Sequence, residues 1–363
     1  MVKPKTGWIN LTIACNMRCG GCYVADAIVK SASEGKSRSM PTHEVLKLID
    51  QMTEMGCDKL VLLGGEPTIH PGFMQVYKYA RHEKGLLVRF ATNGRTFSNK
   101  EFSKAIVEAG LVSDGCTFSM HAPNAELAPA FIGSVTGFIQ FEQGLKNLIE
   151  LGVYPNVNIV LAVAMLPHVR EMMKFLQQLG FKKVSFNLGS PGVEGDKVEY
   201  GHCIPPDQLA EESWKLYEYG NEIGLRAHFL YLIPFCLLDF HRMKELVGTG
   251  RISSGCQISS GRGILFNKDG DLIPCNHMQD KVTLPKKEIQ DILQQGKFDE
   301  FWNSDGMRSV RASTSVYRSD HCRTCGWYNM CGGGCALFWA HFDPRQYIRG
   351  VNKPVPEEEM AHV

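Results

Sequence analysis

Residues 8–23 read WINLTIACNMRCGGCY and place three cysteines directly after a short apolar run. The run WINLTI predicts a β-strand, and the loop after it carries Cys15, Cys19 and Cys22 as C-x3-C-x2-C, with no further cysteine before Cys57. Cysteines that hold iron–sulfur clusters usually come in fours, so a set of three predicts a [4Fe–4S] cluster with one iron open to substrate. Buried thiols or a zinc knuckle are the alternatives, but structural zinc usually has four protein ligands.

The rest of the first half alternates short apolar runs with helical patterns. Val45, Leu48, Ile49 and Met52, for example, are spaced as one face of a helix. Such alternation predicts an α/β protein with a parallel sheet, here a partial (β/α)6 TIM-like barrel followed by a small Cys-rich C-terminal domain. Barrels of this kind place their chemistry at the C-terminal ends of the strands. The expected strands are residues 8–13, 60–63, 87–91, 116–120, 157–165 and 184–187.

Composition and charge narrow the functional class. The 363 residues are 44% hydrophobic and 21% charged, which is typical of a globular protein. Lys and Arg number 39 and Asp and Glu 38, and this balance argues against nucleic acid or anionic lipid as a partner. The start has no apolar export signal, and the longest apolar run, residues 159–166, is too short to span a membrane. We therefore expect a cytoplasmic protein whose 13 cysteines bind metal or clusters rather than form disulfides.

Glycine or polar residues follow three of the expected strands. Paired glycines allow a backbone to approach a ligand closely, and a Glu66 carboxylate at the barrel mouth would suit an ammonium group. Each motif alone is more often an ordinary turn, but their recurrence at successive strand ends favours a binding site. His121, in the last of these loops, is interpreted as a hydrogen-bonded turn histidine. The candidate cofactor-binding residues are Gly64, Gly65, Glu66, Pro67, Asn93 and Ser119.

Residues 8–190 resemble the radical S-adenosylmethionine (SAM) enzymes in the three-cysteine loop and the glycine motif. The resemblance implies that the three cysteines hold a [4Fe–4S] cluster whose open iron is chelated by SAM. It also implies that residues 64–67 contact the SAM amino group and that Asn93 and Ser119 lie near its ribose and carboxylate. Reductive cleavage would then give a 5′-deoxyadenosyl radical that takes hydrogen from substrate. One departure is Gly21, where the family usually has an aromatic residue near the adenine.

A second cysteine pattern lies nearer the C-terminus and resembles the SPASM extension of radical SAM enzymes. That extension binds auxiliary iron–sulfur clusters, so the resemblance implies one or two auxiliary [4Fe–4S] clusters here. The family pattern has one more cysteine after the last of these, and this chain has none. The pattern reads Cys256, Gly270-x4-Cys275 and Cys322-x2-Cys325-x5-Cys331-x3-Cys335.

How the auxiliary clusters are completed stays open in the sequence. The resemblance implies one ligand set of Cys256, Cys275 and Cys335 and another of Cys322, Cys325 and Cys331. An open iron or a further ligand would complete each, and the candidates are Cys203, His202, His277 and His321. A single auxiliary cluster, or a structural zinc site on the last four cysteines, is the alternative. The remaining thiols, Cys57, Cys116 and Cys236, are expected to be core residues.

Four parts are expected along the chain. Residues 1–200 would form the radical SAM partial barrel and residues 201–250 a helical linker. Residues 251–345 would form the SPASM-type domain, and residues 346–363 a C-terminal tail.

The resemblance implies an oxidoreductase that abstracts hydrogen, and a ribosomally made peptide is the expected substrate, with a crosslink, thioether or oxidation as the product. Because Cys15 lies near the start, any leader peptide would need a separate partner or the SPASM domain. Sulfatase-maturing relatives have an aspartate base where Asn276 stands, which disfavours that activity. A small molecule such as a sugar or cofactor precursor is the alternative substrate, and a non-catalytic cluster scaffold the alternative role. The expected electron donor is a flavodoxin or ferredoxin, and no catalytic acid or base is identified.

Overall fold

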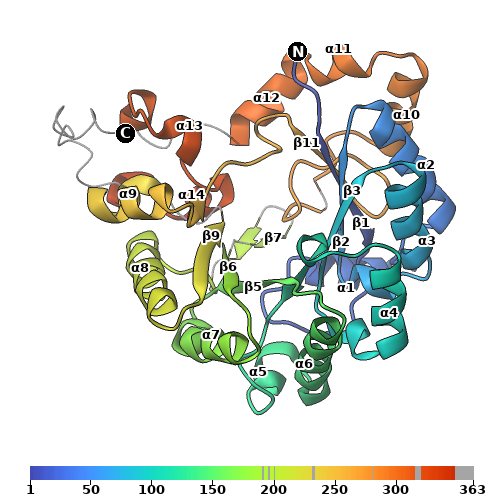
Figure 1. Cartoon of the computed structure of the whole chain (residues 1–363). Helices are drawn as coiled ribbons and strands as arrows, with labels where there is room; N and C mark the ends of the chain where they lie inside the picture. Colours follow the sequence, from blue (N-terminus) through green and yellow to red (C-terminus); the bar gives the residue numbers. More distant parts are fainter. Residues whose placement is uncertain are drawn as a thin grey trace.

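In the computed structural model, one parallel sheet runs through most of the chain and helices cover its outer face (Figure 1). The structure describes residues 1–189, 192–194, 197–199, 201–230, 234–279, 281–314 and 320–347. The strands are β1 (Thr6–Thr12), β2 (Lys59–Gly64), β3 (Leu87–Thr92), β4 (Cys116–Ser119), β5 (Asn156–Leu161), β6 (Lys183–Leu188), β9 (Arg226–Leu230), β10 (Ile252–Ser253) and β11 (Gly263–Phe266), with β7 (Gly192–Glu194) and β8 (Lys197–Glu199) in a separate hairpin.

The helices fill the connections between strands. They are α1 (Ala25–Ser33), α2 (Thr42–Glu54), α3 (Phe73–Lys78), α4 (Lys100–Glu108), α5 (Ala128–Ile132), α6 (Val135–Glu150), α7 (Val169–Gln178), α8 (Pro206–Glu222), α9 (Phe240–Gly248), α10 (Lys286–Gln294), α11 (Phe298–Trp302), α12 (Asp305–Thr314), α13 (Tyr328–Cys331), α14 (Ala336–His341) and α15 (Pro344–Tyr347). Short 3-10 turns include η1 (Pro67–Ile69), η3 (Arg95–Ser98) and η6 (Phe235–Leu237).

The sheet is open, and its strand order is β10-β9-β6-β5-β4-β3-β2-β1-β11. The six strands expected from the sequence are its centre, so the predicted α/β partial barrel is confirmed. Strand β11 extends it beside β1, and β9 and β10 extend it beside β6. Every pairing in this sheet is parallel, so the C-terminal ends of all these strands lie along one rim.

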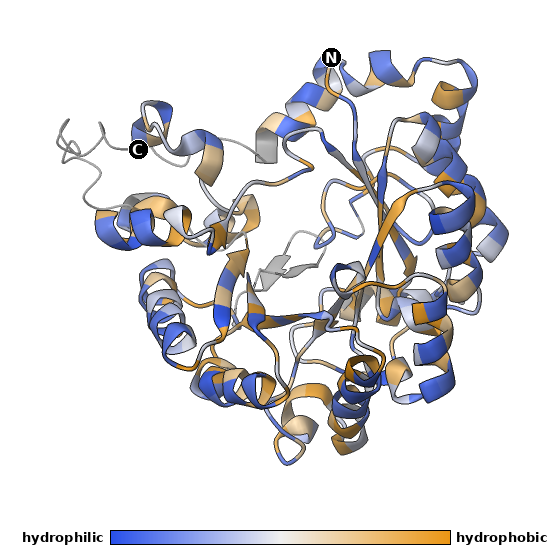
Figure 2. Ribbon diagram, viewed as in Figure 1, coloured by the Kyte–Doolittle hydropathy of each residue, from blue (hydrophilic) through white to orange (hydrophobic). Residues whose placement is uncertain are grey.

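Side chains alternate along the strands, so that one face of the sheet is apolar and the concave face is polar. On β5, Val157, Ile159 and Leu161 are buried in the apolar core against the helices. Because successive side chains point to opposite faces, Asn156 and Asn158 face the concave side of the sheet. The helices complement this pattern, since their outward surfaces are largely hydrophilic and their inner surfaces apolar (Figure 2). The expected inward face of α2 is confirmed, because Val45, Leu48, Ile49 and Met52 are buried.

The segment expected to be a helical linker also contributes to the sheet. Helices α8 and α9 account for its helical pattern, but Arg226–Leu230 forms β9, which pairs with β6. Its apolar residues Ala227 and Phe229 alternate with Arg226 and His228, a strand pattern too short to stand out between two helices. The expected domain boundaries stay a prediction.

A short hairpin-like turn follows β11. Phe266 and Leu272 make an isolated antiparallel bridge, and Gly270 takes a left-handed φ of 85° in the turn between them. Residues 263–266 also pair in parallel with β1, so this hairpin is joined to the barrel edge. Within the described residues, no helix has the length and apolar character needed to cross a membrane.

Candidate functional site

The first three cysteines lie on the loop after β1, at the rim where the parallel strands end. Burial raises the pKa of Cys19 to about 12, and the neighbouring charges of Cys22 and Cys15 add to this effect. The Sγ of Cys15 accepts a hydrogen bond from the Met17 N–H at 3.4 Å. Burial also raises the pKa of Cys15, and crowded thiols of this kind ionise readily only beside a cation. The loop therefore suits the iron ions of a cluster.

The glycine motif after β2 is bound to this loop through its backbone. The Gly65 N–H donates to the Thr12 carbonyl at 2.7 Å, and the Glu66 N–H donates to the Ala14 carbonyl at 2.9 Å. A Cβ on Gly65 would lie 2.5 Å from the Ile13 carbonyl oxygen, which leaves no room for any other residue. The Tyr23 hydroxyl donates to the Gly64 carbonyl at 2.8 Å. Close packing of two backbones therefore explains the glycines without a ligand.

The Glu66 carboxylate lies at the rim where β2 and β3 end, and protein donors surround it. It is fully buried. It accepts hydrogen bonds from the Thr68 hydroxyl at 2.6 Å, the Thr92 hydroxyl at 2.8 Å and the Asn93 N–H at 2.6 Å. Burial raises its pKa, while these hydrogen bonds act in the opposite direction. These donors tie the end of β2 to the end of β3 through the carboxylate, and its expected part in cofactor binding stays a prediction.

Asn93 connects the end of β3 to the cysteine loop. Its Nδ2 donates to Asn16 Oδ1 at 2.7 Å and lies 3.7 Å from Cys15 Sγ. Hydrogen bonds to sulfur tune iron–sulfur clusters, so this contact is directed at the expected metal ligand. Ser119 ends β4 and is half-buried. His121 follows it, and burial lowers the pKa of its imidazole to about 4, so the ring is neutral near pH 7.

The C-terminal cysteines fall into two groups that match the expected division. Burial raises the pKa of Cys275 to about 12, and the charges of Cys335 and Cys256 raise it further. In the other group, burial raises the pKa of Cys331, and Cys325 and Cys322 act in the same direction. The structure thus brings each expected set together, while its ligand role stays a prediction.

Two further cysteines lie near these groups: Cys236, which sequence reasoning missed, and Cys203, which was already a candidate ligand. Cys236, expected in the core, is only partly buried, and its pKa is raised to about 12 by burial and by the charges of Cys331, Cys322 and Cys325. Cys203 is buried and lies near Cys335. No local spacing links either cysteine to the C-terminal pattern, because both precede it by many residues.

A junction joins the first loop to the C-terminal half. The rings of Tyr23 and His277 lie 5.4 Å apart, centre to centre. Tyr23 follows Cys22, and His277 lies two residues after Cys275, so the junction spans two expected cluster sites. Among the described residues, the buried Nδ1 of His277 has no hydrogen-bond partner. Buried nitrogens are nearly always partnered, so this orphan fits a cofactor or substrate held at the junction.

The expected zinc alternative finds no support in the described part of the chain. Four thiolates around one tetrahedral zinc lie about 3.8 Å apart, given Zn–S bonds of about 2.3 Å. No group of three or more His, Cys, Asp or Glu side chains there is placed to hold a single ion.

Comparison with known families decides between these chemistries. A model of the Radical SAM superfamily matches residues 9–179, and one of the iron-sulfur cluster-binding domain SPASM matches residues 256–326. The chain is a radical SAM enzyme with a SPASM domain. Its cofactors are S-adenosylmethionine, a [4Fe–4S] cluster that binds it, and one or two auxiliary clusters. Which side chains ligate each cluster is not decided by these matches.

The radical SAM enzyme is similar to curated proteins along most of its length. It is 24% identical to the AdoMet-dependent heme synthase of Oleidesulfovibrio alaskensis over 335 residues, 89% of this chain and 80% of the relative. It is 25% identical to Mycofactocin maturase MftC of Mycobacterium ulcerans over 332 residues, 90% of this chain and 81% of the relative. It is 26% identical to the Fe-coproporphyrin III synthase of Methanosarcina barkeri over 348 residues, 91% of this chain and 82% of the relative.

Solved structures share its fold. The structure of anSMEcpe with bound AdoMet has a TM-score of 0.67 at 19% identity, covering 92% of this chain and 89% of that one. Streptococcus suis SuiB bound to precursor peptide SuiA has a TM-score of 0.66 at 18% identity, covering 96% of this chain and 76% of that one. At these identities the likeness establishes the architecture of the radical SAM enzyme.

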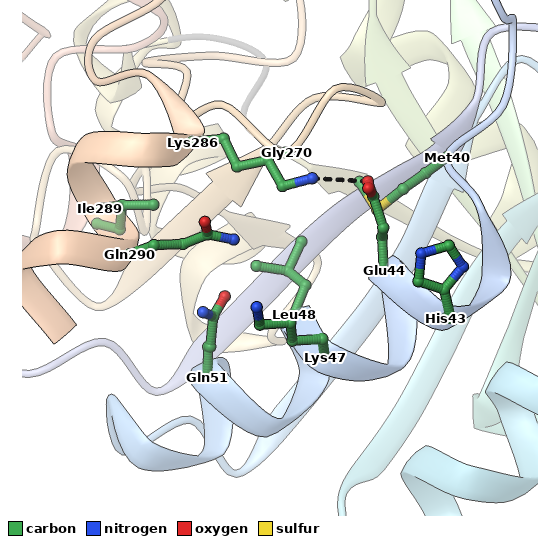
Figure 3. Close-up of a pocket in the computed structure, with 10 residues that line it drawn as sticks. All are labelled: Met40, His43, Glu44, Lys47, Leu48, Gln51, Gly270, Lys286, Ile289 and Gln290. Atoms are coloured by element: carbon green, nitrogen blue, oxygen red, sulfur yellow. Dashed lines mark hydrogen bonds and ion pairs between the residues drawn. The ribbon is translucent and has the colours of Figure 1, made fainter. Parts of the chain in front are cut away.

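A cavity of about 280 Å³ lies away from the expected cluster sites, between α2 and α10 (Figure 3). The Lys286 ammonium and the Glu44 carboxylate meet across it at 2.7 Å. Apolar Leu48 and Ile289 and the amides of Gln51 and Gln290 complete much of its wall. None of the residues that line it is an expected cofactor or metal ligand of the radical SAM enzyme.

Proposed function

We propose that this enzyme oxidises a ribosomally made peptide by hydrogen-atom abstraction and so introduces a crosslink, a thioether or an oxidised residue. The observation that carries the reaction class is the Tyr23–His277 junction, which brings the segment of Cys275 against the segment of Cys22. When bound, the first cluster and SAM supply a 5′-deoxyadenosyl radical that removes a hydrogen atom from the substrate. Cys275, an expected ligand of an auxiliary cluster, lies two residues before His277. The auxiliary cluster would then accept the second electron from the substrate.

The reaction balances as a two-electron oxidation. One electron from a flavodoxin or ferredoxin cleaves SAM to methionine and the radical, which becomes 5′-deoxyadenosine when it takes the substrate hydrogen. The substrate radical then loses one proton and one electron, or bonds to a neighbouring nucleophile that releases its proton while the electron leaves.

Peptide as the substrate is supported by the relatives and by the polar interior. Among the similar proteins, MftC is named a maturase and SuiB is bound to a precursor peptide. In the described part of the barrel, the buried Oδ1 atoms of Asn158 and Asn187 have no hydrogen-bond donor. Both residues alternate with core side chains and so face the concave side of the sheet. Peptide N–H groups are donors of the kind that such orphaned acceptors need.

The first test uses the reconstituted enzyme with SAM, dithionite and the product of a short open reading frame that neighbours its gene. We expect peptide-dependent 5′-deoxyadenosine and a peptide mass lower by two hydrogens. With the peptide deuterated, deuterium should appear in 5′-deoxyadenosine. If 5′-deoxyadenosine forms without any change in peptide mass, a peptide substrate is contradicted, whereas the radical SAM assignment stands.

Asn158→Leu tests the polar interior. Losing the acceptor should raise the peptide KM roughly 5- to 150-fold, the equivalent of about 1–3 kcal/mol, while thermal stability holds or rises. The matched control is Asn147→Leu, because buried Asn147 donates to the Phe97 carbonyl at 2.8 Å and accepts from Gln143 at 2.8 Å. That variant should lose stability and keep its KM. An unchanged KM in Asn158→Leu would assign its oxygen to ordered water.

Oxidation of an iron tetrapyrrole is the second candidate. It is favoured by the heme synthase and Fe-coproporphyrin III synthase among the relatives, whose identities match that of MftC. The same assay with Fe-coproporphyrin III as the probe separates the two, because only one substrate should stimulate 5′-deoxyadenosine formation. Sulfatase-type oxidation stays disfavoured, since Asn276 is an amide and its Oδ1 accepts from Gln279 at 2.9 Å.

A further inference from the structure

The auxiliary group of Cys322, Cys325 and Cys331 is one ligand short of the usual four. Earlier segments of the sequence contain cysteines that could supply a fourth thiolate. The described structure contains one cysteine beside this group that the family pattern does not include, and it is Cys236.

Turn η6 brings Cys236 to this group through direct contacts of the two residues that precede it. The N–H of Phe235 donates to the Sγ of Cys331 at 3.3 Å, across 96 residues of sequence. The Phe235 ring meets the Trp327 ring edge-on, with centres 6.4 Å apart. Before it, Pro234 packs so closely on Gly334 that a Cβ there would lie 3.1 Å from the proline Cδ. The turn and the cysteine loop therefore form one packed unit, with α13 and α14 beside β9 and α9 (Figure 1).

The surroundings of Cys331 are those of a cluster ligand. Its sulfur receives N–H donors from Phe235 and from Gly333, which stabilise a thiolate. Cys331 and Cys322 are buried, and Cys236 and Cys325 are partly buried. One packed unit therefore gathers these four thiols, and the irons of a cluster bind thiols in their deprotonated form.

We propose that Cys236 is the fourth protein ligand of the auxiliary cluster held by Cys322, Cys325 and Cys331. The site is then closed, with a thiolate for each iron, and suits electron transfer rather than substrate binding. The open auxiliary iron, if there is one, belongs to the group of Cys256, Cys275 and Cys335. This inference rests on the SPASM assignment and is independent of which substrate the enzyme oxidises.

Cys203 is not equivalent to Cys236 in this respect. Its thiol donates to the Gly189 carbonyl at 3.0 Å, and Cys335 is the one thiol whose charge raises its pKa. Cys203 therefore lies near one cysteine of the other auxiliary group. Cys236, in contrast, lies close enough to interact electrostatically with all three of its expected partners.

The test removes the first cluster so that only auxiliary iron is counted. In a full-length Cys15/Cys19/Cys22→Ala background, the single changes Cys236→Ser, Cys322→Ser and Cys57→Ser are reconstituted anaerobically and compared. Iron, sulfide and zinc per chain and the electron paramagnetic resonance spectra of the oxidised and reduced proteins are measured. Cys57 is the matched control, because burial also raises its pKa to about 12 but no cysteine contributes to the shift.

We expect Cys236→Ser and Cys322→Ser to behave alike. Each should lose about four irons, or about one iron with a [3Fe–4S] signal in the oxidised protein, and Cys57→Ser should match the background. Iron content and spectra unchanged in Cys236→Ser would overturn the proposal, and so would an unaltered iron content in Cys322→Ser. The proposal would also be overturned if the Cys15/Cys19/Cys22→Ala background protein contained zinc instead of auxiliary iron.

A measurement on the unmutated enzyme covers the case in which Cys236→Ser fails to fold. The cluster-loaded enzyme and the same enzyme after iron chelation are treated with iodoacetamide and mapped by peptide mass. A Cys236 that binds iron is protected in the loaded enzyme and alkylated after chelation, together with Cys325. Equal alkylation of Cys236 in the two samples would overturn the proposal.

Discussion

The two cysteine-rich regions of this enzyme are built in opposite ways. Cys15, Cys19 and Cys22 occupy eight consecutive residues on one loop after β1. The distant auxiliary group takes Cys322, Cys325 and Cys331 from one segment and, in our proposal, a fourth thiol from the turn after β9. In the first region one loop supplies every sulfur, and in the second the packing of two segments supplies them.

This difference separates what each region is suited to do. A three-cysteine loop leaves one iron without a protein ligand, and the neighbouring Asn93 and the glycine motif border that side of the loop. A group closed by four thiolates has no such position. In our proposal, the cysteines that are close in sequence hold the open, reactive cluster. The cysteines that only the tertiary structure brings together hold a closed cluster that exchanges electrons.

The largest effect should come from removing either set of cysteines. The Cys15/Cys19/Cys22→Ala enzyme should form no 5′-deoxyadenosine above background and lose about four irons. The Cys322/Cys325/Cys331→Ala enzyme should still cleave SAM but release little or no modified product, because the second electron has no exit. Chromatography of 5′-deoxyadenosine and product in the same reactions measures both. Product formation undiminished in the second variant would show that the two regions are not coupled.

Glu66→Gln tests the anchoring of the open region. The amide cannot accept all the donors that now reach the carboxylate, including the Asn93 N–H at 2.6 Å. We expect the free energy of unfolding to fall by about 1–3 kcal/mol, measured by urea denaturation of the apoprotein. The control Glu44→Gln breaks the half-exposed pair with Lys286 at 2.7 Å and should cost less than about 1 kcal/mol. Equal losses of unfolding free energy in the two variants would mean that the buried Glu66 carboxylate contributes no more to stability than the half-exposed Glu44 carboxylate.

Asn93→Ala should change the redox property of the first cluster more than its assembly. Removing the Nδ2 donor 3.7 Å from Cys15 Sγ leaves the thiolate more electron-rich. The midpoint potential, measured by a titration followed by electron paramagnetic resonance, should therefore become more negative with iron content unchanged. Asn99→Ala removes the cap of α4 and serves as control, since it should lower stability without moving the potential. A potential that does not move would remove Asn93 from the tuning of this region.

His121 should give the smallest effect, through acid stability. Burial lowers its pKa from the ordinary 6.5 to about 4, so the unfolded chain binds this proton at a higher pH than the folded one. Stability is therefore fully present above pH 6.5 and is lost as pH falls toward about 4. His121→Gln should flatten this part of the curve of melting temperature against pH, with His82→Gln as the control. A curve as steep as that of the unmutated enzyme would assign the acid loss to other groups.

Much of the barrel was predictable because its signals are local. Apolar runs alternate with helical periodicity, and β1 to β6 were found close to their expected positions. Strand β9 was missed because its alternation of apolar and polar residues is short and lies between two helices. Such a segment is recognised as a strand only through its pairing with a neighbour, here β6. Glu66 was placed in the right segment, but the direction of its carboxylate depended on donors from β3.

The sequence by itself determined the three-cysteine loop, the parallel α/β fold and the C-terminal cysteine pattern, because each follows from spacing within a few residues or from periodicity. Only the tertiary structure decided that Cys236 lies beside Cys331 and that Tyr23 meets His277. These contacts join residues far apart in the chain, and nothing in local spacing encodes them. The parallel sheet accounts for the second contact, since β1 and β11 are neighbours whose C-terminal ends share one rim, and the first contact depends on the packing of η6 against the C-terminal cysteine loop.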